Sequence, residues 1–389
     1  MLVKKIIKFV YGLVFLTAIG TLATVVPQEE LSSTKSIMSQ FLTHLTGLRK
    51  YMGSQEIFTD PKNNYEISMH LKEFSKLAKK AHEDVNLQKT NFKFSREVLE
   101  EHIIDTERLF RLGNKSFARW KLSSTLSVCM SCHTQMPGTS KVFEEIRRLK
   151  PLTSDFEQAE FLFAIRDFES AYKIYDQAIL SFPKGSFDSS QIEMALGRQL
   201  MYFSRIKKDP AAALVVFEKY RQLKNLPAVT RADIASWVQQ FQKWTKQPLP
   251  SLTTATDQQI LDFVKSKIDV KRKSQDIDFV TYLQVSGLLY EFLQYRPESK
   301  VVPEILYWLS ICDRAMHNTF FYSLADLYLR ECITKYPTDP IALKCFQEYE
   351  TQVILGYTGS RGVDMPQEVA DDLKQLEKLV TSQKFKSKK

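Results

Sequence analysis

Five consecutive residues, Cys129-Met130-Ser131-Cys132-His133, combine side-chain types and spacing that point directly to a chemistry. Two thiols three positions apart can each form a thioether with a vinyl group of one haem, and the imidazole that follows can bind the iron. The sequence therefore predicts one covalently attached haem c, held by Cys129 and Cys132, with His133 as the proximal iron ligand.

Three other uses of this motif stay open. A thiol–disulfide exchange site usually begins a helix in a βαβ setting, and the sequence has no strand pattern of that kind. A zinc site needs a second ligand pair, and Cys312, Cys332 and Cys345 do not supply one at a suitable spacing. A structural disulfide between Cys129 and Cys132 remains an alternative in an oxidising compartment.

Helical periodicity places the motif on a helix and predicts three more helices before it. Leu122, Leu126, Cys129 and His133 follow one another at i, i+4, i+7 and i+11, on one face of a helix. The few glycines and prolines and the long 3.6-residue patterns predict an all-α chain. Three of the four expected amphipathic helices cover residues 33–52, 65–85 and 95–112. The fourth starts near residue 116 and runs through the cysteine motif until Met136, Pro137 and Gly138 end it. Four helices with short links predict an antiparallel bundle.

In this layout, residues 33–139 resemble the class II c-type cytochromes, the cytochrome c prime and cytochrome c-556 group. Members of that family carry C-x-x-C-H late in the fourth helix of a four-helix bundle, where Cys129 to His133 lie here. The resemblance implies a haem-binding four-helix bundle over residues 33–140 and electron transfer as its function. It also implies that Met38, on the apolar face of the first helix, is the sixth iron ligand. Met38 as core packing, or His44 or His70 as ligand, are the alternatives.

After Pro151 the pattern changes to helical hairpins that resemble tetratricopeptide repeats. Residues 159–183 carry small and aromatic residues at that spacing, ending in Pro183, and a weaker copy precedes Pro227. The sequence thus predicts a tetratricopeptide-like α-solenoid over residues 152–380, with a break near 248–256. Residues 381–389 form a basic tail. The three remaining cysteines are expected to be buried thiols; a Cys312–Cys332 bridge is the alternative.

The first thirty residues predict export. Lysines precede an uncharged apolar run over residues 9–26, which indicates a signal peptide or an inner-membrane anchor within residues 1–30. Both options place the rest of the chain in the periplasm. The formal net charge is +9, but the basic residues are scattered without a nucleic-acid module, so no nucleic-acid partner is expected.

These observations predict a periplasmic c-type cytochrome that transfers electrons to or from a redox partner protein. Its helical repeats would provide a surface for docking proteins. A haem-based gas sensor that signals through the repeats, and a repeat scaffold in which haem is secondary, are the alternatives. No catalytic residue is assigned and no enzyme activity is expected, although peroxidase-like chemistry at an open iron position stays possible.

Overall fold

The computed structural model describes residues 33–135, 152, 154–268, 278–316, 320 and 322–381. Within these ranges the protein is helical apart from one small antiparallel hairpin, β1 (Thr358–Gly359) paired with β2 (Gly362–Val363). The expected all-α class is confirmed. The basic tail lies outside the described residues, as do residues 1–32.

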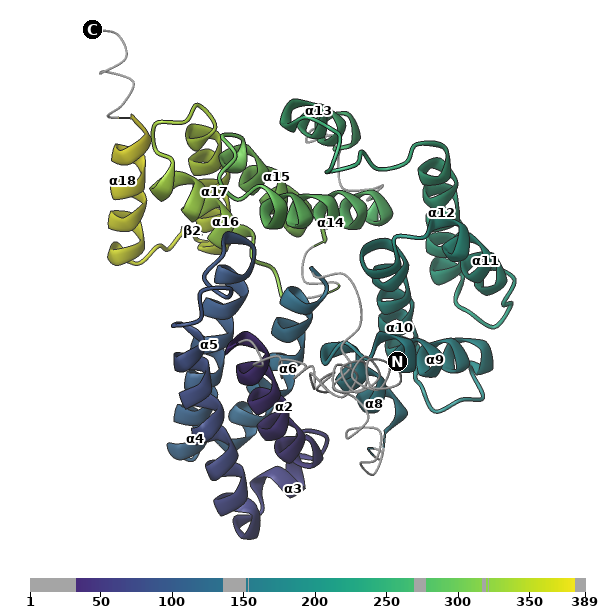
Figure 1. Ribbon diagram of the computed structural model, residues 1–389. Coiled ribbons are helices and arrows are strands. Elements are labelled where there is room, and N and C mark those ends of the chain that lie inside the picture. The colour runs from purple at the N-terminus through teal and green to yellow at the C-terminus, as the bar shows by residue number, and fades with distance from the viewer. Residues whose placement is uncertain are drawn as a thin grey trace, which may run out of the picture.

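The N-terminal helices, α2 to α6, pack against one another in chain order, and α2 also contacts α6 (Figure 1). Their bounds are α2 (Ser33–Met52), α3 (Gln55–Thr59), η1 (Pro61–Asn63), α4 (Asn64–Ala81), α5 (Thr90–Arg111) and α6 (Lys115–His133). Two details differ from the sequence analysis. A short helix, α3, and the 3₁₀ turn η1 lie between the first two long helices, where the sequence analysis expects no helix. Helix α5 begins five residues before the expected residue 95, because Phe92 and Phe94 are buried in its first turn.

Apolar faces of the four long helices make the core of this part of the molecule. Leu48, Leu71, Ile103 and Leu122, one from each helix, are at most 1% exposed. The link between α5 and α6 turns at Gly113, whose φ of +84° favours glycine and is typical of the residue after a helix end. Each helix thus presents one apolar stripe to its neighbours.

The C-terminal helices, α8 to α18, follow as successive helix pairs. They are α8 (Asp155–Ala164), α9 (Phe168–Ser181), α10 (Ser189–Met201), the π-helical η2 (Tyr202–Lys207), α11 (Pro210–Arg221), α12 (Ala228–Lys246), α13 (Asp257–Lys267), α14 (Phe279–Tyr295), α15 (Val302–Met316), α16 (Ala325–Lys335), α17 (Ala342–Gly356) and α18 (Gln367–Thr381). Repeat-type positions such as Ala159, Ala171, Phe217 and Leu329 are buried. No helix lies between Lys246 and Asp257, where the break was expected.

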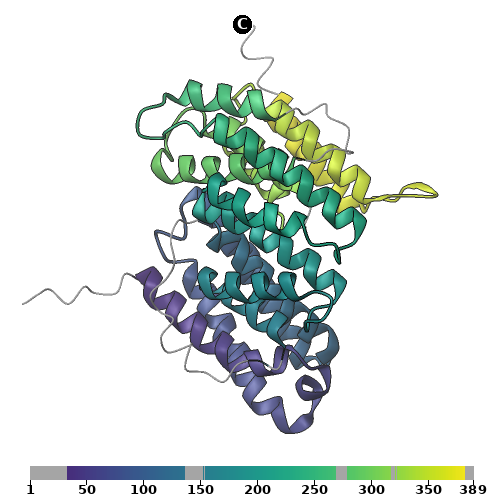
Figure 2. The same cartoon turned by 90° about the vertical axis from the view of Figure 1, so that its right-hand side faces the viewer.

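The C-terminal helices run in an arc that begins beside α6 and returns to α5. Helix α8 packs on α6 at the start of the arc, and α14, further along it, packs on α5 (Figure 1). Lys93 on α5 pairs with Glu331 on α16 at 2.8 Å, and Phe94 packs edge-on against Tyr328 at 5.2 Å between ring centroids. Seen from the side, the helices form tiers from α2 near one end to α18 near the other (Figure 2). The arc therefore contacts the N-terminal helices both at its start and further along its length.

The cysteines of the C-terminal helices differ from the expectation. Cys332 and Cys345 form a disulfide between α16 and α17, with a Cα–Cα distance of 6.4 Å, whereas Cys312 is a buried free thiol. The expectation of a buried thiol is confirmed for Cys312 and wrong for Cys332 and Cys345, and the alternative Cys312–Cys332 bridge is wrong. The antiparallel packing of α16 on α17 brings residues 13 positions apart into register across the connecting turn, which the repeat spacing alone did not reveal.

None of the helices described is long and apolar enough to cross a membrane. The apolar run at 9–26 lies outside the described residues.

Candidate functional site

The C-x-x-C-H motif forms the last two turns of α6. Cys129, Cys132 and His133 are all half-buried, and the two cysteines carry free thiols rather than a disulfide. The two sulfurs belong to residues three apart, so they project from neighbouring positions of one helix surface. Leu122, about two turns before Cys129 on the same stripe, is buried in the core.

A hydrogen bond from the C-terminal helices orients the imidazole of His133. Nδ1 of His133 lies 2.5 Å from the carbonyl oxygen of Ala164, at the end of α8. A carbonyl only accepts, so Nδ1 carries the proton and donates it, which leaves Nε2 as the basic nitrogen. Burial lowers the pKa of His133 to about 4, against an opposing effect of the Ala164 carbonyl. The ring is therefore neutral at pH 7, the form that binds a metal ion.

Burial also acts on the thiols. Desolvation raises the pKa of Cys129 to about 12, with a further contribution from Cys132. Desolvation likewise raises the pKa of Cys132 to about 12, against the opposing charge of Arg166. Both sulfurs are neutral thiols at pH 7, so this surface is unlike a reactive thiolate site.

Two further segments of the C-terminal helices hold the end of α6. The hydroxyl of Ser131 donates to the carbonyl oxygen of Tyr322, in the link before α16, at 2.8 Å. The guanidinium of Arg205, in η2, donates to the hydroxyl of Thr134 at 3.4 Å. Ser131 and Thr134 are 1% and 2% exposed. Together with the bond to Ala164, contacts from three separate segments enclose the turn that carries His133.

Two polar groups beside the motif match the chemistry of a haem, which carries two propionate carboxylates. Within the described residues, both amide atoms of Gln135, a residue 5% exposed, lack a hydrogen-bond partner. A buried amide without a partner is costly, and a polar group of a bound ligand would offset that cost. The cationic Arg166 lies near Cys132 and complements an anion. The residues at this site therefore fit the group that the motif predicts.

Met38 lies at the same end of the N-terminal helices as the motif. Helices α2 and α6 are antiparallel: Arg119, near the start of α6, donates to the carbonyl oxygen of Met52, at the end of α2. Met38 lies fourteen residues before Met52, and His133 lies fourteen residues after Arg119. Both residues are thus about 21 Å from this contact along antiparallel helices. Met38 is partly buried against the core, at the level of His133.

The other two histidines considered as ligands bind each other. Nδ1 of His44, on α2, lies 3.1 Å from Nδ1 of His70, on α4, so one ring donates to the other. Burial lowers the pKa of both rings. His44 lies six residues beyond Met38, toward the opposite end of α2. The structure therefore places this pair away from the level of His133.

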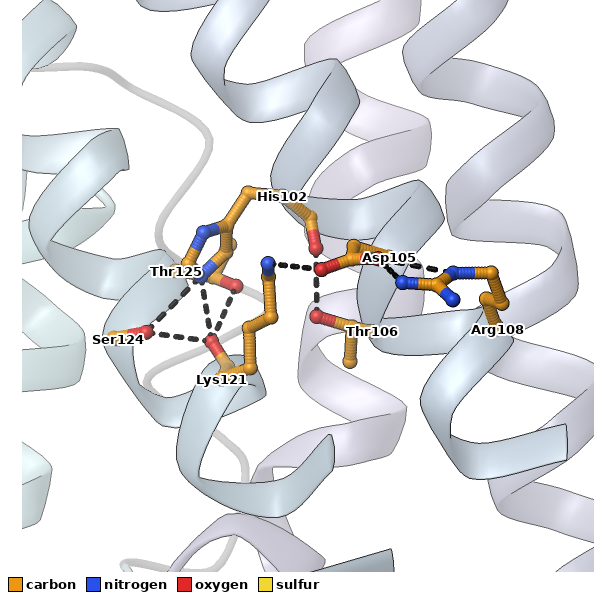
Figure 3. A network of polar contacts seen from close by, with 7 residues as sticks. All are labelled: His102, Asp105, Thr106, Arg108, Lys121, Ser124 and Thr125. Atoms are coloured by element: carbon orange, nitrogen blue, oxygen red, sulfur yellow. Dashed lines mark hydrogen bonds and ion pairs between the residues drawn. The ribbon is translucent and has the colours of Figure 1, made fainter. Parts of the chain in front are cut away.

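A polar network that the sequence analysis did not identify joins α5 to α6 (Figure 3). His102 donates from Nε2 to the carbonyl oxygen of Lys121 at 2.7 Å, and Ser124 donates to the same oxygen at 2.8 Å. Asp105 pairs with Lys121 and with Arg108. These contacts fix the lateral position of α6 one to two turns before Cys129. A lone histidine in an amphipathic pattern carries no sequence signal for such a role.

In the part of the chain that the structure describes, no three or more His, Cys, Asp or Glu side chains cluster as they do around a metal ion bound by protein alone. A haem iron needs one or two protein ligands, since the porphyrin supplies four, so the motif does not require such a cluster.

Comparison with known proteins gives no relative: no family model, curated protein or solved structure matches this chain.

Proposed function

We propose that this chain is an exported c-type cytochrome that transfers electrons, with one haem c bound through Cys129, Cys132 and His133. The observation that carries the proposal is the pairing of the C-x-x-C-H motif with an oriented imidazole. His133 donates from Nδ1 to the carbonyl oxygen of Ala164, the arrangement by which metal-binding histidines are commonly fixed through their second nitrogen.

Each residue of the site has a distinct part in this proposal. Bound haem supplies an iron centre that cycles between the ferric and ferrous states. Cys129 and Cys132 would hold the porphyrin covalently, and Nε2 of His133 would bind the iron. Met38 is the candidate second iron ligand, because it lies at the level of His133 on the antiparallel helix α2. A thioether ligand favours the reduced iron, as suits an electron carrier rather than an enzyme.

The arrangement of helices supports the two architectures that the sequence predicts. Helices α2, α4, α5 and α6 contact one another in chain order and α2 contacts α6, which supports an antiparallel four-helix bundle like that of cytochrome c prime. The successive pairs from α8 to α18 resemble a degenerate tetratricopeptide-like α-solenoid, whose outer surface is available to a redox partner protein. Both assignments belong to the proposal.

A periplasmic location is consistent with the Cys332–Cys345 disulfide, because disulfides persist in oxidising compartments. The same compartment is where c-type haem is attached in bacteria that mature cytochromes after export.

The test is an absorption spectrum of the full-length chain produced in a host that attaches haem to C-x-x-C-H motifs. The oxidised and reduced spectra should be those of a c-type cytochrome, and a Cys129→Ala/Cys132→Ala variant should lose the covalent pigment. The matched control is Cys312→Ala, which removes a buried thiol outside the motif. A colourless wild-type chain, or a double variant that keeps covalent pigment, would overturn the proposal.

A second candidate function is a haem-based gas sensor, and one observation favours it. The bond between His133 and Ala164 joins the iron ligand directly to the C-terminal helices. If a small gas bound the iron and the imidazole moved, the hydrogen bond to Ala164 would transmit that movement directly to α8. This function requires an open iron position, and the Met38→Ala experiment described in the Discussion distinguishes it from electron transfer.

A further inference from the structure

A buried cluster of polar side chains lies behind the motif and is not used by the proposed function. Its members are Arg205 on η2, Ser286 and Tyr290 on α14, Asp313 on α15 and Tyr328 on α16, all at most 2% exposed. Burying a charged group costs free energy unless the group is paired and hydrogen-bonded. The presence of a buried cation and a buried carboxyl group in this cluster therefore requires an explanation.

Hydrogen bonds link the cluster into one chain of contacts. Tyr328 donates to the hydroxyl of Tyr290 at 3.0 Å, and Tyr290 donates to Oδ1 of Asp313 at 3.3 Å. The backbone N–H of Leu324 donates to Oδ2 of Asp313 at 3.1 Å. Asp313 thus accepts from two neutral donors, which stabilise a carboxylate less than a direct ion pair does.

Arg205 connects this carboxyl group to the haem motif. Its guanidinium lies 5.0 Å from the centroid of the Tyr290 ring and binds the hydroxyl of Ser286 at 2.6 Å. The same guanidinium binds Thr134, the residue after His133. One buried cation therefore stands between the buried carboxyl group and the turn that carries the iron ligand, in surroundings that screen charges weakly.

We propose that Asp313 is a redox-linked proton site, which takes up a proton when an electron arrives at the haem held by His133. This inference rests on the proposed function. The electron comes from the redox partner protein and reduces ferric to ferrous iron; the proton comes from water and binds the Asp313 carboxylate. On oxidation both leave, so the charge of the interior changes little in either direction.

The energetic basis is the balance of charges in the cluster. The groups that interact with Asp313 are Arg205 from η2, Tyr290 from α14, Tyr328 from α16, the adjacent Cys312 and the Leu324 N–H. Burial raises the pKa of Asp313 to about 6, against the opposing charge of Arg205 and the two hydrogen bonds. The protonation of a carboxyl group whose pKa lies near neutrality changes within the physiological pH range when a charge is added nearby.

The experiment measures the midpoint potential of the haem-loaded full-length protein between pH 5 and pH 9. The reduced protein binds the proton more tightly, so the potential should fall as the pH rises past the pKa of the oxidised form. The proton affinity of Asp313 should differ up to about tenfold between the two redox states, which corresponds to a total fall of about 59 mV. In Asp313→Asn the potential should lose this dependence and stay at the low-pH value.

Asp176→Asn is the matched control. Asp176 on α9 accepts a hydrogen bond from the buried Tyr220 on α11 at 2.6 Å. This pair has the same chemistry as the Tyr290–Asp313 pair. This variant should keep the pH dependence of the wild type. Equal dependence in wild type and Asp313→Asn would overturn the inference, since haem propionates or other groups would then be its source.

A second variant covers the case in which Asp313→Asn does not fold. Tyr290→Phe removes one donor to the carboxylate, so the fall in potential should move to higher pH; an unchanged pH range contradicts the inference. Infrared difference spectra of the wild type, reduced minus oxidised, should also show a protonated carboxyl band that appears on reduction. Failure of the proposed function is distinguishable, because a chain without covalent haem has no potential to measure.

Discussion

At the scale of single residues, the position of Met38 distinguishes the two proposed functions. The sequence predicted Met38 as a ligand only through a family resemblance. The structure adds that α2 and α6 are antiparallel and that Met38 and His133 are equally far from the Arg119–Met52 contact. The sequence could not provide this register, because it depends on a contact between residues 67 positions apart.

The first prediction concerns Met38→Ala. If Met38 binds the iron, the variant should change from a low-spin to a high-spin spectrum, and its potential should fall because methionine ligation raises it. Met69→Ala is the control, since Met69 is exposed on α4. An identical spectrum of Met38→Ala and wild type favours the gas sensor and contradicts ligation by Met38.

The second prediction concerns the pH dependence of stability without haem. Native Asp313 keeps its proton up to about pH 6, whereas unfolded chains release it near the ordinary value of 3.8. The folded protein therefore binds more protons in this interval, and the free energy of unfolding should fall by about 2–3 kcal/mol between pH 4 and pH 6. Urea denaturation of Asp313→Asn and of wild type checks this. The variant should lack that decrease, and parallel pH profiles would contradict the assignment.

At the scale of elements, periodicity predicted most of the helices, because each buries one apolar stripe. It did not predict α3, because only one side chain of this short helix, Phe58, is buried, and one apolar position does not define a helical period. The disulfide was missed for another reason: Cys345 belongs to the next helix, and only the packing of α16 on α17 brings it to Cys332. The sequence alone predicted the C-x-x-C-H motif, because its residues are contiguous. It could not predict the partners Ala164, Tyr322 and Arg205, because they are distant in sequence and only the fold brings them to the motif.

The third prediction concerns the buried ion pair between α8 and α10. Arg198 binds both carboxylate oxygens of Glu160, at 2.8 Å and 2.9 Å, and Tyr175 donates to the same carboxylate. Glu160→Gln should lower the free energy of unfolding by about 3–5 kcal/mol, because it leaves a buried guanidinium uncompensated. Glu218→Gln, in a surface pair with Arg221, should cost less than about 1 kcal/mol. Equal losses in chemical denaturation would contradict the distinction.

At the scale of the whole molecule, the C-terminal helices form part of the surroundings of the C-x-x-C-H motif. Three of their segments bind the last turn of α6, and α16 returns to α5 through Lys93 and Phe94. The repeats were predicted as a docking surface for other proteins. Part of their inner surface contacts this chain itself, so a redox partner is proposed to dock outside it.

The fourth prediction follows from these contacts: the N-terminal and C-terminal helices should unfold together. Variants that keep only Trp120, on α6, or only Trp237, on α12, should give the same fluorescence midpoint in urea as far-ultraviolet circular dichroism. Two separate midpoints would show that the two groups of helices are independent and would contradict their shared role at the site.

The central claim, covalent attachment of one haem, is tested most directly by the mass of the denatured full-length chain from a cytochrome-maturing host. The account predicts a mass raised by one haem, on a peptide that contains Cys129 and Cys132, after solvents have removed every non-covalent ligand. An unmodified mass from a host that attaches haem to a control cytochrome in the same culture would contradict it.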